Sequence, residues 1–576
     1  MRGRTKKRLP AMLCAACLLL AVMCSCGTPA TETSVLPSEP DISATQPESV
    51  QASAPEPAVS ADSVLEASSQ EPEETEFVDD WVWPVDTPDA ALSLWYAYPP
   101  FFPNFYDSAD EFPAWVYCQE KTGIDIQFEE CTFMNAQENL TLMIASGSYT
   151  DMLFNMSNYV TTNLEYAVNE SIVVDIAPYI EAHAPNYARY FFSDDTYVKQ
   201  ATTDQGYIPA VYQLNDVAAN EGINKSGPVI RSDWLEQSGL ELPATYDEYH
   251  EVLVAFQQFC DHPFWMPYTG GYLGAMFSGG FGVSAEISSS RSFIQEDGKV
   301  VFCPTQDGFR DYLSLMHQWY TEGLINPDFA SNTQNAYAPT NDEIVNEEIG
   351  VWSSAANLMD FTNLGNPNVV VVASTNPVQK KGDTTVFGDK TAALGAELCI
   401  TTDCRNVELA MRWCDWWYTE DGYYTTNYGI EGESFVFDDQ GNPQYTELIL
   451  NPQGDMTVNI AQSLYTCGNG MLLGVQDPKR AYQWYTPDKV EAEKLWGTVD
   501  LATGLMPRVS MTAEESAVFS SRFSDISTYL QQIVPQFIIG TEPLENWDVY
   551  VENIEAVGLA ECLSVEQAAL DRYNAR

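Results

Sequence analysis

The stretch ALSLWYAY, residues 91–98, is a continuous apolar and aromatic run that two prolines at 99–100 bring to an end. Such a run predicts a buried strand followed by a loop. Two further strand patterns are TGIDIQF at 122–128 and DMLF at 151–154, and residues 135–147 between them carry an apolar helical face. This alternation indicates α/β units with a parallel sheet, in which the strand ends face ligands.

The later part of the chain continues to alternate helical and strand patterns. In chain order these are a helix opened by a capping box at Thr245 and Glu248, strands at 368–373 and 398–400, a tryptophan-rich helix at 407–420 and a helical region after 513. We expect the indoles of Trp413, Trp416 and Trp417 to lie in the core and at the lobe surface, and a sugar platform is the alternative. A second capping-box pattern at Ser564 and Gln567 predicts another helix start.

The N-terminal residues have the pattern of an export signal. A basic cluster at 2–8 precedes an apolar run at 11–23, which is too short for a comfortable membrane span. The sequence MCSCG at 23–27 then resembles a lipobox, and we expect cleavage after residue 25 and acylation of Cys26. The expected product is an exported protein that is lipid-anchored to the outer face of the cell membrane. An ordinary signal peptide with incidental cysteines is the alternative.

Residues 26–80 are predicted to be a disordered tether. From 28 to 80 the sequence is rich in Pro, Ser, Ala, Thr and Glu and contains no Lys or Arg, so it lacks the apolar surface that folding requires. A flexible chain of roughly 50 residues has a mean reach of about 40 Å. The remaining residues, 81–576, are long enough for a large core that is divided between two or more domains.

The charge and the cysteines exclude some classes of partner and cofactor. A formal net charge of -56 makes nucleic acid a poor partner, because two polyanions repel each other. Nine cysteines follow position 26, and no two of them form a CxxC pair, so the sequence predicts neither a metal site nor a cofactor. Export permits disulfides, but these spacings do not require any.

Six phrases spread over the chain resemble the extracellular solute-binding lipoproteins (family 1) that serve carbohydrate ABC importers. They are TGIDIQFEE at 122, LMIASGSYTDMLF at 142, IRSDWLEQSGLELPATYDEYHEVLVAF at 230, AMRWCDWWYTEDGYYTTNYGIEGESF at 410, DDQGNPQYTE at 438 and FIIGTEPLENWDVYVENIEAVGLAECLSVEQAALDRY at 537. The resemblance implies an α/β type II periplasmic-binding-protein fold, in which two α/β lobes close on a ligand in the cleft between them. It also implies a monomer that delivers its solute to the transmembrane subunits of a permease.

The same resemblance implies where the lobes begin and end. The first lobe is expected to hold about 85–207 and 395–425, and the second about 213–390 and most of 426–576. Crossings are expected near 207–213, near 388–395 and after Gly422.

Candidate ligand-binding residues follow from the chemistry of sugars, whose apolar ring faces stack on aromatic side chains and whose hydroxyls need polar partners. In the first lobe these are Trp95 and Tyr96 near the end of the first strand and Asp151 at the start of the third. Core packing for Trp95, and a turn or cap for Asp151, are the alternatives.

In the second lobe the candidates are Trp265, Tyr272 and Trp352. Trp265 precedes a glycine-rich stretch at 270–282 that contains Tyr272. Trp352 follows a strand-like run and precedes a predicted helix start at 353–355, and core packing is again the alternative. We expect Arg231, which belongs to one of the family phrases, to support the fold rather than contact the ligand.

Motifs of common enzymes are absent from the sequence. It contains no GxxxxGK[ST], HExxH or GxSxG pattern, and its four histidines form no spaced cluster. The sequence therefore predicts a binding protein and not an enzyme. A surface-anchored glycoside hydrolase and a ligand-presenting sensor protein of the same fold are the alternatives. The acidic loop at 438–442 lacks the spaced ligands of an EF-hand and is predicted to be a hairpin turn.

Overall fold

A computed structural model describes 82–86, 90–99, 102–160, 164–215, 225–266, 268, 277–331, 339, 341–356, 359, 366–385, 393–453, 456–466, 473–498 and 504–576. All of these residues belong to one compact unit, Thr75–Arg576. The signal peptide, Cys26 and the tether predicted at 26–80 lie outside the described residues. Within the described part, no helix is both long enough and apolar enough to cross a membrane.

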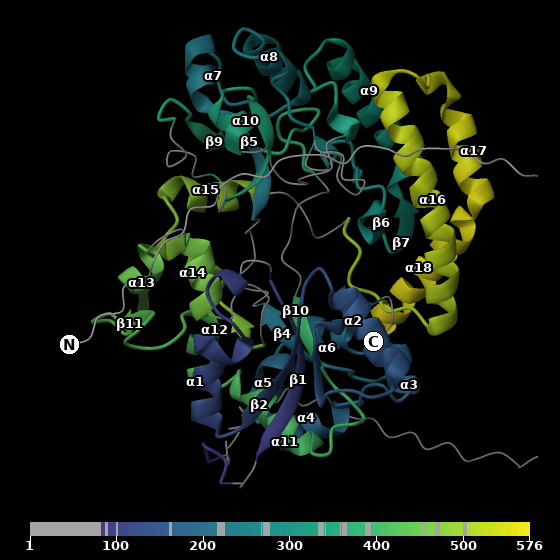
Figure 1. The fold of residues 1–576 in the computed structure, drawn as a ribbon. Coiled ribbons are helices and arrows are strands. Elements are labelled where there is room, and N and C mark those ends of the chain that lie inside the picture. Colours follow the sequence, from purple (N-terminus) through teal and green to yellow (C-terminus); the bar gives the residue numbers. More distant parts are fainter. Residues whose placement is uncertain are drawn as a thin grey trace, which may run out of the picture. The chain divides into compact units, whose positions relative to one another are not determined.

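The first lobe is built around a six-stranded sheet with the order β13-β4-β10-β3-β1-β2 (Figure 1). The strands are β1 (Ala91–Tyr98), β2 (Asp125–Thr132), β3 (Met152–Phe154), β4 (Val211–Asn215), β10 (Leu394–Ile400) and β13 (Val475–Gln476). Five of them run parallel, and β10 is antiparallel to both of its neighbours. The first three strands confirm the strand patterns predicted from residues 91–98, 122–128 and 151–154.

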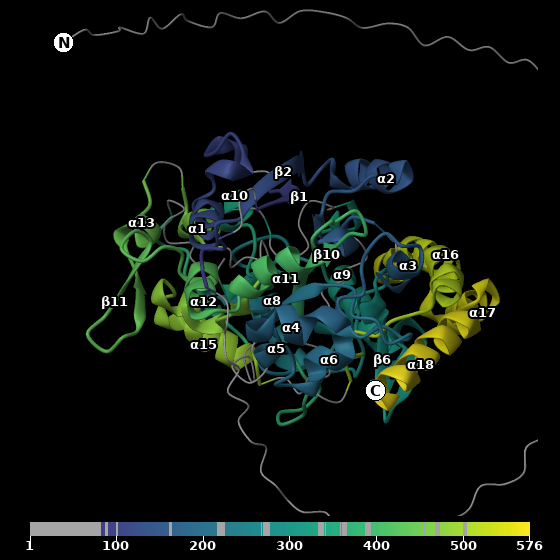
Figure 2. The same cartoon turned by 90° about the horizontal axis from the view of Figure 1, so that it is seen from below.

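Helices cover this sheet and share the first core with its strands. They are α1 (Pro113–Thr122), α2 (Ala136–Ser146), α3 (Leu164–Asn169), α4 (Ile180–His183), α5 (Pro185–Phe191), α6 (Asp195–Ala201), α11 (Val407–Trp416) and α12 (Glu420–Asn427). Figure 2 shows α4, α5 and α6 gathered together on one side of β1 and β2. Trp115 of α1 stacks on Trp413 of α11 with their ring centroids 5.8 Å apart, and Trp417 meets Trp115 edge-on. The indoles of this helix therefore lie in the core, as predicted.

The second lobe contains a three-stranded antiparallel sheet with the order β8-β5-β9. Its strands are β5 (Ser226–Arg231), β8 (Val351–Ala355) and β9 (Val371–Ala373), and a hairpin of β6 (Phe293–Glu296) and β7 (Lys299–Phe302) lies apart from them. The helices around them are α7 (Ser232–Ser238), α8 (Tyr246–Phe256), α9 (Asp307–Thr321), α10 (Asn341–Val345), α15 (Pro487–Trp496), α16 (Ala513–Ile539), α17 (Trp547–Val557) and α18 (Leu559–Ala575). Residues from β5, α8, α9, α16, α17 and α18 share one apolar core.

Two of the predicted local features differ from the structure. The helix start predicted at 353–355 is wrong, because Ser353 and Ser354 continue β8 and pair with Pro228 and Gly227 of β5. The helix start predicted from the capping-box pattern at Ser564 and Gln567 is also wrong, since both residues lie inside α18. By contrast, the capping box that opens α8 at Thr245 is present.

The segment after α12 belongs more to the first lobe than the sequence indicated. Hairpin strands β11 (Phe435–Phe437) and β12 (Pro443–Tyr445) and helices α13 (Glu447–Leu450) and α14 (Val458–Tyr465) form a small apolar cluster of their own. Leu464, Leu473 and Val475 then join the first core, and β13 pairs with β4. The turn predicted at 438–442 is confirmed, because it connects the two strands of this hairpin.

Candidate functional site

The carboxyl edge of the first sheet is where the chain passes between the lobes. Strand β4 ends at Asn215, and the next described strand, β5, lies in the second sheet. The chain returns from β9 into β10, whose first residue, Leu394, pairs with Leu214 at the same edge. It leaves again after β13 and enters α15, which packs against β5 and β9. Because the described crossings meet at this edge, it is the edge at which an α/β sheet binds its ligand.

Four aromatic side chains, which we call the edge aromatic group, follow the carboxyl ends of β1, β2 and β3. Tyr98 ends β1 and stacks on Phe102, with ring centroids 5.5 Å apart. Phe133 follows β2 and lies 5.9 Å from the ring of Tyr159, which in turn meets buried Trp95 edge-on. Phe133 is 43% exposed. Burial raises the pKa of Tyr159 to about 12, so its hydroxyl stays protonated and can donate a hydrogen bond.

A buried carboxylate lies at the same edge. Glu397 of β10 accepts a hydrogen bond from the backbone N–H of Ser157 at 2.7 Å, and its carbonyl accepts another from Asn155. Asn155 has a left-handed backbone with φ 58°, a conformation that asparagine tolerates better than most residues. Nearby, the Arg508 guanidinium lies 5.7 Å from the ring centroid of Tyr212. The edge therefore combines apolar ring faces with a carboxylate, a guanidinium and a protonated hydroxyl.

The three residues predicted in the first lobe lie below this edge or within the core. Trp95 is fully buried and donates a hydrogen bond from Nε1 to Asn139 Oδ1 at 2.6 Å. Tyr96 is buried and packs edge-on against Trp115. Asp151 precedes β3, and its carboxylate accepts hydrogen bonds from the N–H and hydroxyl of Ser93, both at 2.7 Å. The contacts of Trp95 are those of core packing, which was the alternative for that residue. The contacts of Asp151 are those of a turn or cap, which was its alternative. Ligand binding by the three residues stays a prediction.

The residues predicted in the second lobe also lie in a core where they are described. Trp265 and Trp352 are buried in one apolar cluster together with Trp496 of α15. The Trp496 indole donates to the carbonyls of Pro228 and Ser374, at 3.3 and 3.1 Å. This cluster fixes α15, the element that follows a crossing, against the second sheet. Tyr272 lies outside the described residues.

The family phrase around Arg231 has a structural role, as the sequence predicted. The Arg231 guanidinium is buried and makes a two-pronged contact with the Asp233 carboxylate, from Nε at 2.7 Å and from Nη2 at 2.5 Å. It also lies 4.3 Å from the ring centroid of Trp234. These contacts join the end of β5 to the first turn of α7.

Sequence reasoning missed the edge aromatic group, Glu397 and Arg508. Phe133 and Tyr159 were within reach of the strand-end argument, because each follows a strand that the sequence predicts. Glu397 and Arg508 are far apart in sequence and are brought to this edge only by the tertiary fold, so no local pattern indicates them.

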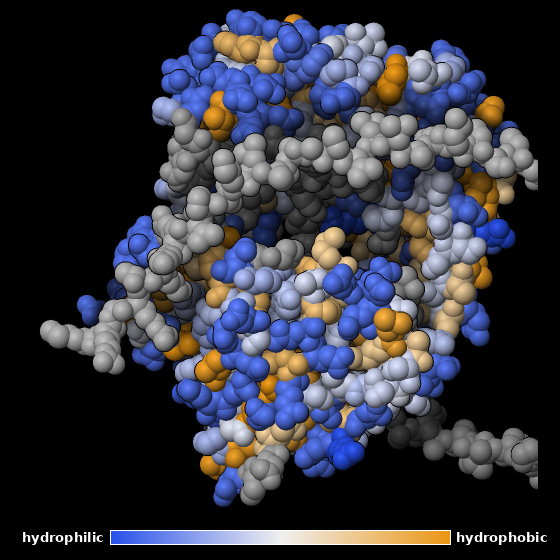
Figure 3. All heavy atoms as spheres, in the orientation of Figure 1, coloured by the Kyte–Doolittle hydropathy of each residue, from blue (hydrophilic) through white to orange (hydrophobic). Residues whose placement is uncertain are grey.

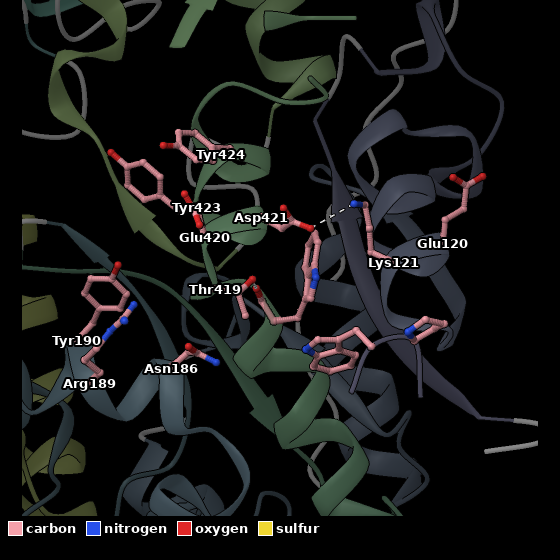
Figure 4. Close-up of a pocket in the computed structure, with 13 residues that line it drawn as sticks. Glu120, Lys121, Asn186, Arg189, Tyr190, Thr419, Glu420, Asp421, Tyr423 and Tyr424 are labelled. Atoms are coloured by element: carbon pink, nitrogen blue, oxygen red, sulfur yellow. Dashed lines mark hydrogen bonds and ion pairs between the residues drawn. The ribbon is translucent and has the colours of Figure 1, made fainter. Parts of the chain in front are cut away.

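A separate cavity of about 720 Å³ opens on the first lobe (Figure 4). It is lined by Trp83, Pro84, Glu120, Lys121, Asn186, Arg189, Tyr190, Trp416, Thr419, Glu420, Asp421, Tyr423 and Tyr424. Its lining includes an ion pair between Lys121 and Asp421 at 3.2 Å, and the Arg189 guanidinium lies 4.7 Å from the Tyr190 ring centroid. Of the three charged groups in these contacts, Lys121 and Asp421 therefore neutralise each other.

The chemistry available to a metal is limited in the described part of the chain. No group of three or more His, Cys, Asp or Glu side chains there could hold a metal ion.

The face drawn in Figure 3 is dominated by hydrophilic side chains, in keeping with the large excess of acidic residues.

Comparison with known proteins relates this chain to solute-binding proteins. No family model matches the sequence. The chain is 22% identical, over 79% of its length and 86% of the relative, to the fructooligosaccharide ABC transporter substrate-binding protein FusA of Streptococcus pneumoniae serotype 4. It is 21% identical, over 58% of its length and 65% of the relative, to lipoprotein LipO of Bacillus subtilis.

Solved structures give the same fold. An extracellular solute-binding protein of Bifidobacterium longum subsp. infantis has a TM-score of 0.69 at 17% identity, covering 84% of this chain and 98% of that one. The alginate-binding protein AlgQ2 has a TM-score of 0.65 at 21% identity, covering 85% and 99%. The chain therefore has the two-lobed α/β fold of the periplasmic-type binding proteins, as the sequence predicted.

Proposed function

We propose that this chain, a relative of the substrate-binding proteins of ABC transporters, captures an oligosaccharide outside the cell and delivers it to a membrane permease. The observation that carries this proposal is the edge aromatic group at the carboxyl edge of the first sheet, where the crossings between the lobes meet. The relatives support the class of solute. One is a fructooligosaccharide ABC transporter substrate-binding protein, and solved structures of the same fold include an alginate-binding protein and an HMO-binding solute-binding protein.

The edge suits a sugar for physical reasons. Partly exposed Phe133, and Tyr98 held in place by its stack on buried Phe102, offer flat apolar faces for pyranose or furanose rings. The protonated Tyr159 hydroxyl offers a hydrogen-bond donor for a sugar oxygen. The net charge of -56 favours a neutral glycan, because an acidic one would be repelled as it approached.

Capture requires no bond to be broken. A ligand that touches both lobes stabilises the arrangement in which they are closed, and the driving force is its greater affinity for that arrangement. The closed form then presents one combined surface to the transmembrane subunits. Two α/β lobes with separate cores, joined by crossings at a single edge, have the construction that this motion needs.

Export and anchoring complete the proposal. A relative named as a lipoprotein supports an exported protein, and acylation at Cys26 would hold it at the membrane surface as a monomer on a flexible tether. Metabolic labelling with an alkyne fatty acid tests the anchor. Label is expected on the unmodified chain and is expected to be lost in Cys26→Ala.

The binding proposal is tested by titrating the purified protein with neutral oligosaccharides, with an acidic oligosaccharide and a peptide as controls. The matched variant is Phe133→Ala, and Leu142→Ala on the exposed face of α2 is its control. We expect a neutral glycan to bind, to be recovered uncleaved, and to bind Phe133→Ala more weakly than Leu142→Ala. Recovery of a cleaved glycan, or binding of the peptide alone, would contradict the proposal.

A further inference from the structure

A cluster of ionic contacts joins the two lobes through side chains rather than through the backbone. We call it the Asp204 cluster, and its members are Asp204, Ser510, Glu515, Arg572 and Arg576. The Asp204 carboxylate accepts hydrogen bonds from Arg572 Nε at 2.6 Å and from Ser510 Oγ at 3.1 Å, and it also contacts Arg576 Nη2. The Asp204 side chain is only 5% exposed.

Asp204 is fixed to the first lobe by its own loop. Thr203 donates from its N–H to the carbonyl of Tyr207 at 2.9 Å, and Gln205 donates from its N–H to the buried carboxylate of Glu165 at 3.0 Å. The preceding helix α6 is held by Tyr197, whose hydroxyl donates to the carbonyl of Asn215 at the end of β4. Asp204 therefore moves with the six-stranded sheet.

The other members belong to the second lobe. Ser510 and Glu515 lie at the start of α16, where Thr512 and Glu515 form a capping box. The middle and end of α16, together with α18, contribute Ile526, Leu530 and Leu570 to the second core. The ends of both helices extend toward the first lobe at this point, as Figure 1 shows for α18 and the C-terminus beside α6.

The two arginines of the Asp204 cluster also bind acceptors other than Asp204, one in each lobe. Arg572 makes a two-pronged contact with Glu515, from Nη1 at 2.9 Å and Nη2 at 2.5 Å. Burial is the largest single influence on the pKa of Glu515 and acts to raise it, but the hydrogen bonds from Arg572 and Thr512 and the charge of Arg572 together leave that pKa lowered. Arg576 donates from Nη1 to the carbonyls of Lys199 and Thr202 at the end of α6, at 2.9 and 2.5 Å.

Separating these groups would be costly. Two guanidinium groups face two carboxylates in partly buried positions, and each arginine bridges more than one acceptor. Charge-assisted pairs of this kind are about twice as strong as neutral hydrogen bonds, and removing one partner leaves the others desolvated without compensation. Contacts that are strong and multiply connected resist separation of the lobes at this point.

We propose that the Asp204 cluster is a noncovalent pivot, a point at which the two lobes stay in contact while they open and close. This inference rests on the lobe closure in the proposed function. The covalent crossings restrain the lobes at the carboxyl edge of the sheet, and the cluster adds a second restraint that selects one direction of rotation. Without it, the lobes of the ligand-free protein sample a broader range of separations.

The test measures the separation of the lobes in the ligand-free, full-length protein by double electron–electron resonance. Spin labels are attached to Leu142→Cys on α2 and Val254→Cys on α8, two exposed positions in different lobes. The unmodified chain treated with the same label corrects for reaction at native cysteines. The test variants are Asp204→Asn and Arg576→Ala.

The control is Arg522→Gln, which removes an ion pair at 3.5 Å between α16 and α18 without touching the first lobe. We expect the distance distribution to broaden in both test variants and to remain unchanged in the control. If Asp204→Asn does not fold by circular dichroism, Arg576→Ala decides the question, because its side chain lies at the end of α18. A distribution that is the same in all variants would overturn the pivot. Because no glycan is present, this result is independent of whether the proposed function holds.

Discussion

Glu566 of α18 makes the stability of the second lobe depend on pH in a way that the structure specifies. Its side chain lies in the interior of the lobe, and desolvation by burial raises its pKa from 4.5 to about 7. The unfolded chain releases this proton near 4.5 and the folded chain releases it near 7. Between these values the unfolded state binds fewer protons, so the free energy of unfolding falls as the pH rises.

The size of the effect follows from the shift. A difference of about 2.5 pKa units at 1.36 kcal/mol per unit gives about 3 kcal/mol, absent below pH 4.5 and complete above pH 7. The substitution Glu566→Gln removes the charge and keeps the shape of the side chain. The variant is therefore expected to gain stability relative to the unmodified protein as the pH rises from 4.5 to 7.5.

Urea unfolding, followed by tryptophan fluorescence at a series of pH values, measures this difference. Glu552→Gln, on the exposed face of α17, is the matched control and is expected to show no such gain. The reasoning is refuted if the difference between Glu566→Gln and the unmodified protein is the same at pH 4.5 and pH 7.5.

Three further substitutions have expected outcomes. Arg231→Met leaves the Asp233 carboxylate without its two-pronged partner and is expected to cost about 3–5 kcal/mol in urea unfolding, whereas a loss of less than 1 kcal/mol would show that the pair contributes little. Gly227→Ala places a methyl group 2.2 Å from the Trp496 ring and is expected to cost about 1–3 kcal/mol and shift the tryptophan emission, while an unchanged spectrum would mean that α15 does not pack as described. Phe133→Ala removes a half-exposed ring and is expected to weaken glycan binding by roughly 1–2 kcal/mol in calorimetry without lowering the midpoint of thermal unfolding, and a lowered midpoint would assign the ring to the core instead.

Local sequence patterns predicted much of the fold. The strands at 91–98 and 151–154 and the box at Thr245 were readable because continuous apolar runs and cap residues report on their own immediate surroundings. Patterns failed where a distant partner decides the outcome. Gln567 was taken for a cap residue, but its side chain accepts from the N–H of Val300 and donates to the carbonyl of Gly298, and so binds the β6–β7 hairpin.

The candidate site was harder to predict than the fold. Large aromatics such as Trp95, Trp265 and Trp352 attract attention in a sequence, yet they are buried in the described core because burial of large apolar area stabilises folding. The edge aromatic group was recognisable only after the carboxyl ends of the strands were known. Arg508 and Glu397 could not be predicted from local sequence, because only the tertiary fold brings their distant segments to the same edge of the sheet.

The central claim, that the chain binds a neutral oligosaccharide between its lobes, is tested most directly by a thermal-unfolding screen of neutral glycans. A glycan present at about 100 times its dissociation constant is expected to add about 2.7 kcal/mol of stability, and calorimetry on Phe133→Ala is expected to show weaker binding of the same compound. Stabilisation by one class of neutral oligosaccharide, recovered intact, is the predicted result. If every glycan leaves the midpoint unchanged while a peptide raises it, the claim of carbohydrate binding is contradicted.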